Sequence, residues 1–92
     1  MTNETNHAWV AYKRLITDFV DADFVRTCAR AEYDRAEAAL AWARTDMERV
    51  RAKTDMERVR AEYDRVEAAL ARARTDMERA RVAYYRMYNV AD

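Results

Sequence analysis

The chain has 92 residues, and its 17 basic residues are balanced by 17 acidic ones, so the formal net charge is zero. A neutral chain is not drawn as a whole to nucleic acid or to an anionic membrane surface. Gly and Pro are both absent. Because these two residues interrupt helices, we expect an all-α fold in a single helical domain, 1–92.

The first predicted element is a short helix over about residues 6–20, within the sequence HAWVAYKRLITDFV. Its apolar residues recur at intervals of three or four and form one broad face. The main ones are Trp9, Tyr12, Ile16 and Phe19. Asp21 and Asp23 follow, and either side chain could cap a new helix. We therefore expect this short helix to end near residue 20 and to pack at one end of the fold.

Two repeats come next, residues 31–53 and 61–83, which are identical at 18 of 23 positions. Their apolar residues alternate at spacings of three and four, which are the a and d positions of a coiled-coil heptad. The first run is Tyr33, Ala36, Leu40, Ala43, Met47 and Val50. The second run is Met56, Val59, Tyr63, Val66, Leu70, Ala73, Met77, Ala80, Tyr84 and Met87. Each run predicts a narrow seam between helices.

The nonapeptide TDMERVRA, followed by Lys or Glu, stands twice in succession between these runs. Nine residues rotate a helix by about two and a half turns, so in one unbroken helix the two seams would point away from each other. A reversal between Arg51 and Asp55 would let the seams face each other. Thr54 and Glu57 match a capping box at this place.

These patterns predict an antiparallel, coiled-coil-like helical hairpin with the short N-terminal helix packed at one end. There we expect the aromatic residues Trp9, Tyr12 and Phe19 to lie with Tyr84, Tyr85, Met87 and Tyr88. The long helices are expected over about residues 23–52 and 55–90, with Leu40 facing Leu70. The alternative is one continuous long helix, whose two seams would each need a separate partner.

Catalytic chemistry has few side chains to use. His7 is the single histidine, whereas nucleophile–base pairs and zinc or di-iron sites need histidines at defined spacings. Acidic residues on the long helices stand three or four positions from an arginine, as Glu62 does from Arg58, which is typical of solvated ion pairs. We therefore predict no enzyme, no metal site and no cofactor.

Cys28 is the single cysteine, so no disulfide can form within the chain, and we expect a small buried side chain there. The sequence shows no leader and no apolar run of the roughly 18 residues that a membrane helix requires. We expect a cytoplasmic protein without a membrane partner.

Five arginines recur every seven residues on the second long helix, at heptad c positions. They are Arg58, Arg65, Arg72, Arg79 and Arg86. Such a line, with about 10 Å between its members, could contact successive phosphates of a nucleic acid. Neighbouring acids such as Asp64 and Glu78 favour a solvated face instead, so we expect nucleic-acid binding to be weak.

Trp42 is the most prominent surface residue that the sequence predicts. It takes the heptad c position of the first repeat, on the solvent side of the seam, where the second repeat has Arg72. A large aromatic side chain on a charged face is typical of a binding anchor, and the aromatic end that contains Tyr85 and Tyr88 is a second candidate. We therefore expect a non-enzymatic helical protein–protein interaction module that forms a homodimer, with Trp42, Tyr85 and Tyr88 in contact with the partner.

Two other functions fit the sequence. One is a small effector of a phage or mobile element that binds and inhibits a host protein or nucleic-acid machine. The other is a weak nucleic-acid binder that uses the arginine line. The residues themselves do not identify a protein partner beyond a second copy of the chain.

Overall fold

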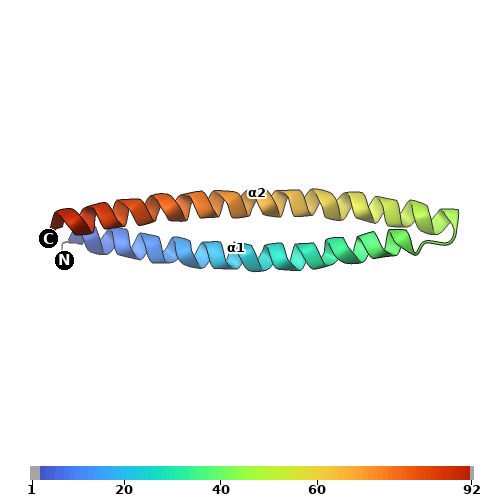
Figure 1. Cartoon of the computed structure of the whole chain (residues 1–92), viewed down its shortest axis with the longest axis horizontal. Helices are drawn as coiled ribbons and strands as arrows, with labels where there is room; N and C mark the ends of the chain where they lie inside the picture. Colours follow the sequence, from blue (N-terminus) through green and yellow to red (C-terminus); the bar gives the residue numbers. More distant parts are fainter. Residues whose placement is uncertain (1–2, 92) are drawn as a thin grey trace. The chain divides into compact units, whose positions relative to one another are not determined.

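The structure is a computed structural model that describes residues 3–91. It contains two α-helices, α1 (Asn3–Ala41) and α2 (Asp46–Ala91), joined by residues 42–45 (Figure 1). The described part of the chain contains no strand, and the expected all-α helical hairpin is confirmed. Neither helix, within the described residues, has a stretch long and apolar enough to cross a bilayer.

The short N-terminal helix expected over about residues 6–20 is wrong, because α1 runs without a break from Asn3 to Ala41. Its buried and half-buried side chains follow one a and d pattern. They are Thr5, Ala8, Tyr12, Leu15, Phe19, Ala22, Arg26, Ala29, Tyr33, Ala36 and Leu40, and Ala43 continues the pattern just past the helix. Ile16 is also half-buried, at an e position beside it. The polar Arg26 hid this continuity in the sequence. Its Nη1 lies 3.6 Å from Glu67 Oε1, so a charged residue on the seam finds a partner on α2.

The predicted reversal between Arg51 and Asp55 is also wrong. The chain reverses at residues 42–45, and α2 continues through both predicted positions, which overturns the expected helix bounds of 23–52 and 55–90. An earlier copy of the capping box ends the turn. Glu48 N donates to Thr45 Oγ1 at 3.1 Å, and Arg44 N donates to Glu48 Oε2 at 2.8 Å. These bonds satisfy amide groups that the start of a helix leaves without partners.

The same tetrapeptide, TDME, behaves differently at its two other occurrences. Thr54 and Thr75 lie inside α2, where each hydroxyl donates to the carbonyl four residues earlier, Val50 O and Ala71 O, at 3.0 Å. The same sequence therefore caps a helix at Thr45, where α2 begins, and forms part of the helix surface at Thr54 and Thr75.

The chain divides into two compact units, in each of which a segment of α1 runs antiparallel to a segment of α2. The first unit comprises residues 3–23 and 69–91 of the described chain, and the second is Phe24–Ala68. In the second unit the ring of Tyr33 lies 5.8 Å from that of Tyr63. This register brings Leu40 level with Met56, so the expectation that Leu40 faces Leu70 is wrong.

In the second unit the first copy of the duplicated nonapeptide makes α2 longer than α1 at the turn. We call the part of α2 that extends past the end of α1 the overhang. α1 ends eight residues after Tyr33, whereas α2 begins seventeen residues before Tyr63, so the first nine residues of α2 extend past the end of α1. The connection continues past the end of α1, alongside this extension, before the chain reverses (Figure 1). Met47 and Val50 lie on it and are 68% and 66% exposed, so their predicted place in the seam of the first helix is wrong.

The seam of α2 follows the predicted second run and extends it by one residue. Ala52, Val59 and Leu70 on this seam are buried, and most other members are half-buried. Ala52 belongs to the overhang, level with the connection at residues 42–45. With the turn at residues 42–45, Ala52 is buried in the seam of α2. With a turn between Arg51 and Asp55, Ala52 would have belonged to the connection.

Candidate interaction surfaces

The first unit contains a cluster of five aromatic rings contributed by both helices. Tyr84 of α2 lies at its centre, with its ring centroid 5.1 Å from that of Trp9 and 6.1 Å from that of Tyr12, both on α1. Tyr85 and Tyr88 complete the cluster, 5.4 and 6.1 Å from Tyr84. Interacting aromatic pairs have centroid separations of about 4.5 to 7 Å. The cluster therefore joins the two helix segments of this unit.

The apolar surface around the cluster is broader than the seam between the helices. Trp9 and Ile16 lie at heptad e positions of α1 with Val20 beside them, and Tyr88 and Tyr85 take the equivalent positions on α2. In antiparallel helices the e positions flank the same side of the seam. Trp9, Tyr88 and Tyr85 are 38%, 42% and 52% exposed, so much of their ring surface stays open. We call these five residues the aromatic face.

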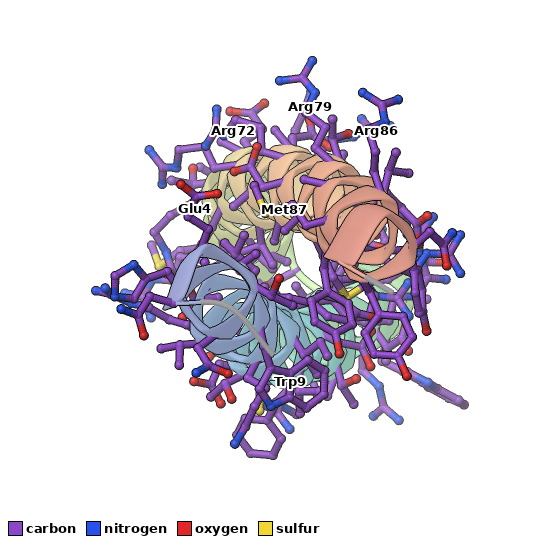
Figure 2. All side chains as sticks on the ribbon, turned by 90° about the vertical axis from the view of Figure 1, so that its left-hand side faces the viewer. Glu4, Trp9, Arg72, Arg79, Arg86 and Met87 are labelled. Atoms are coloured by element: carbon purple, nitrogen blue, oxygen red, sulfur yellow. The ribbon has the colours of Figure 1, made fainter. Side chains whose placement is uncertain are left out.

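Arginines occupy the other side of the first unit. Arg72, Arg79 and Arg86 project together from α2, and Figure 2 shows Trp9 on the side away from them. Glu78, which precedes Arg79, is engaged elsewhere, because Arg81 Nη2 lies 2.9 Å from Glu78 Oε2. The first unit therefore presents Arg72, Arg79 and Arg86 on one side, and its aromatic rings on another side, where Arg74 and Arg81 take e positions of α2.

The two remaining members of the arginine line belong to the second unit. Arg58 and Arg65 are exposed, and Arg58 Nη1 lies 3.9 Å from Glu62 Oε2, as the sequence spacing predicts. All five arginines thus stand at exposed positions of α2, three in the first unit and two in the second. Contact with phosphate at these residues stays a prediction.

A polar cluster surrounds the tyrosine pair of the second unit. The guanidinium carbon of Arg30 lies 5.4 Å from the ring centroid of Tyr33 and 5.8 Å from that of Tyr63. A hydrogen bond with Tyr63, followed by the charge of Asp34, raises the pKa of Arg30. The Tyr63 hydroxyl also lowers the pKa of Glu67 by hydrogen bonding to its carboxylate; desolvation opposes this shift, and the charge of Arg26 adds to it. Tyr63 therefore bridges a cation of α1 and an anion of α2.

Trp42 lies in the connection between the helices. Its backbone N donates to Ala38 O at 3.0 Å, and its side chain is 78% exposed. Arg72, its counterpart in the second repeat, lies inside α2. Trp42 and Arg72 occupy the same position in the two repeats, but Trp42 lies in the connection and Arg72 in a helix. The expectation that both take heptad c positions on a helix is therefore wrong for Trp42.

The residues predicted to contact a partner fall in both units. Tyr85 and Tyr88 come together with Trp9, which the sequence had placed in a separate short helix, whereas Trp42 belongs to the second unit. The broad apolar pattern of residues 7–20 was the signal for Trp9. Cys28 is exposed, so its expected burial is wrong.

Glu67 and Arg26 were not singled out from the sequence, although a charged residue at a seam position is a usable signal for a buried or bridging pair. Among the residues that the structure describes, no three His, Cys, Asp or Glu side chains gather as the ligands of a metal ion would. Comparison of the chain with protein-family models, with curated proteins and with solved structures finds no match.

Proposed function

We propose that the chain is a non-enzymatic helical module that binds protein, including a second copy of itself. The observation that supports this most is the apolar surface that two helices leave open. Within the described range, the buried apolar residues are Ala29, Ala52, Val59 and Leu70. Large apolar side chains stay exposed in greater number. They include Trp9, Val10, Val20, Phe24, Val25, Trp42, Met47, Val50, Val82, Tyr85, Met87 and Tyr88.

The total surface supports the same proposal. The chain exposes 7240 Å² for a mass of 10.9 kDa. A compact monomer of that mass exposes about 5,600 Å², so the excess is about 1,600 Å². One partner in a standard protein–protein interface buries about 800 Å². A partner that covers part of the excess would supply the apolar burial that the two helices lack.

Trp42 is the residue we propose as anchor for a different protein. An indole held in a connection, with most of its surface open, contributes little to the hairpin, and tryptophans are among the residues that most often dominate interfaces. Tyr85 and Tyr88 are the anchors proposed in the first unit.

Urea unfolding at several protein concentrations tests the self-association. If the folded chain associates, mass action raises the unfolding midpoint as concentration rises. A midpoint that is the same across a hundredfold range of concentration, together with a monomeric mass in sedimentation equilibrium, would remove self-association from the proposal.

Weak nucleic-acid binding is a second candidate, because the described part of α2 in the first unit, residues 69–91, has five arginines and two acids. A titration with duplex DNA and with single-stranded RNA at several salt concentrations tests it, since phosphate contacts make affinity fall steeply with salt. We expect no sub-micromolar binding at physiological salt. Tight binding that is lost on changing Arg65, Arg72 and Arg79 to Ala would place this function first.

A further inference from the structure

The connection between the helices and the cap that follows it occur twice in the sequence. Residues 43–52 read ARTDMERVRA and residues 52–61 read AKTDMERVRA, so the two segments differ only where Arg44 corresponds to Lys53. We infer that the turn of the hairpin moves between these copies. In the first form, which is the one described above, the chain reverses at residues 42–45. In a second, less populated form it reverses at residues 51–54, with α1 nine residues longer and α2 nine residues shorter.

The capping interactions of the first form can all be made again nine residues later. Arg44 N and Thr45 N donate to Glu48 Oε2 at 2.8 and 3.4 Å, and Glu48 N donates to Thr45 Oγ1 at 3.1 Å. Thr54 and Glu57 supply the same side chains, and Lys53 supplies the same backbone amide as Arg44. No described residue has a positive φ, so a connection of this kind needs no glycine. The cap therefore does not favour one position over the other.

The alignment of the two helices is the same in both forms. The contact of Tyr33 with Tyr63 brings Ala41, the last residue of α1, level with Asp55 on the antiparallel helix. In the first form α2 extends nine residues past this level, and in the second form α1 does so with residues 42–50. The helix pair outside the tip keeps its contacts, and the number of helical residues does not change. The third capping box, at Thr75, offers no such choice, because a reversal there would place both tyrosines on one helix.

Each form covers apolar side chains that the other exposes. In the first form Ala52 is buried, whereas Met47 and Val50 are mostly exposed. In the second form Ala43, Met47 and Val50 continue the seam of α1 after Leu40, at spacings of three and four, and face the connection. Burial of Met47 and Val50 offsets the loss at Ala52. Minor conformations of proteins are commonly populated at roughly 0.1 to 10%. The second form belongs in this range, and exchange between the forms covers and uncovers Met47 and Val50.

Three matched proline variants separate the two forms. Asp46, Asp55 and Asp76 follow the threonine in the three copies of TDME. Proline is accepted at the first residue of a helix and disrupts its interior. Asp46 is the first residue of α2 in the first form, Asp55 is the first residue in the second form, and Asp76 lies inside α2 in both. Asp46→Pro therefore holds the first form and Asp55→Pro the second, while Asp76→Pro reports the effect of proline inside α2.

Backbone Cα chemical shifts measured by NMR locate the turn in each variant. In Asp55→Pro we expect residues 42–50 to have helical shifts and residues 51–54 to lose them, and in Asp46→Pro we expect the reverse at residues 42–45 and 51–54. The urea midpoint should stay close to that of the unchanged chain in both variants and fall in Asp76→Pro. If α1 still ends at Ala41 in Asp55→Pro and the overhang merely unfolds, the inference is overturned.

Hydrogen exchange tests whether the unchanged chain populates the second form. The amides of Asp55 and Met56 lie inside α2 in the first form but are its first two in the second form, where a helix gives them no partner. The Val50 amide lies inside a helix in both forms. A second form at about 1% limits the protection of Asp55 and Met56 to about a hundredfold, so they should exchange about tenfold faster than Val50. Fraying from the start of α2 gives the opposite order.

Asp46→Pro is the control for this measurement, because it excludes the second form. In this variant Asp55 and Met56 should exchange more slowly than Val50. If Val50 exchanges faster than Asp55 and Met56 in the unchanged chain as well, the second form is not populated and the inference is overturned.

Discussion

Tyr33 and Tyr63 occupy the same position in the two repeats, and their rings contact each other at 5.8 Å across the helices of the second unit. Each tyrosine stands in the same sequence, AEYDR. Because the helices are antiparallel, one copy of this sequence packs on the other about an approximate twofold axis. A duplicated segment thus supplies both sides of its own contact, and the next predictions depend on where the symmetry fails.

The hydroxyl groups of the two tyrosines make different contacts. The Tyr63 hydroxyl forms hydrogen bonds with Arg30 and Glu67, whereas Tyr33 contacts the Arg30 guanidinium through its ring. We expect Tyr63→Phe to lower the urea midpoint of the chain and Tyr33→Phe to leave it nearly unchanged. Urea unfolding of the two variants side by side, followed by circular dichroism, provides the measurement. Equal losses would mean that the bridge adds nothing to the ring contact.

The lowered pKa of Glu67 makes the stability depend on pH. The carboxylate is favoured in the folded chain, so its contribution is complete above the ordinary value of 4.5 and is lost as the pH falls through the lower folded value. We expect Glu67→Gln to flatten the decline in unfolding midpoint in this acidic range, compared with Glu62→Gln as a control. An unchanged pH profile in Glu67→Gln would contradict the assignment.

The three copies of the capping sequence provide a comparison within one chain. Thr45→Ala removes the acceptor of the Glu48 amide and should cost about 1 kcal/mol of unfolding free energy. Thr54→Ala and Thr75→Ala replace a threonine inside a helix by the residue with the best helix propensity, so they should be neutral or slightly stabilising. Denaturant unfolding of the three variants is the measurement. A loss at Thr54 as large as at Thr45 would indicate that the turn lies elsewhere.

Deletion of residues 45–53 tests the overhang. It joins Thr54 directly to Arg44, so a second copy of the capping box follows the connection while the Tyr33 and Tyr63 pair keeps its register. We expect a hairpin of nearly unchanged stability. Because the deletion also merges the two seams on one face, the competing product is a continuous helix that pairs with another chain. Light scattering of the deletion variant and of the unchanged chain at the same low micromolar concentration distinguishes the two products. A mass of the variant well above that of the unchanged chain would show that it forms the continuous helix.

Trp42→Arg places the residue of the second repeat in the connection. The indole is mostly exposed, so the change should alter the unfolding free energy by less than about 0.5 kcal/mol and leave helicity unchanged. Thermal unfolding followed by circular dichroism measures both. A variant that unfolds would show that Trp42 stabilises the hairpin itself, and it would lose its proposed role as an anchor for a partner.

The candidate surfaces were partly predictable. Tyr85 and Tyr88 were identified from their aromatic character near the end of a regular seam, and the arginine line follows from its spacing of seven. The sequence also predicted that Trp9 and the tyrosines Tyr85 and Tyr88 lie together at one end, but which rings contact each other depends on how α1 aligns with α2. The contact between Arg26 and Glu67 also depends on this alignment, which heptad spacing alone leaves free by whole heptads.

The sequence by itself determined that the chain is helical, because it lacks helix-breaking residues. It favoured a hairpin over one continuous helix, because it contains two seams on opposed faces. It also determined the seam of α2 almost completely. Only the tertiary structure decided where the chain reverses, since the sequence offers the same capping box at Thr45 and at Thr54. The capping box at Thr45 begins α2, while the contact of Tyr33 with Tyr63 sets how the two helices align. In this alignment α2 extends nine residues past the end of α1, and Ala52 in this extension is buried. Local caps of equal strength cannot select a turn, and long-range packing can.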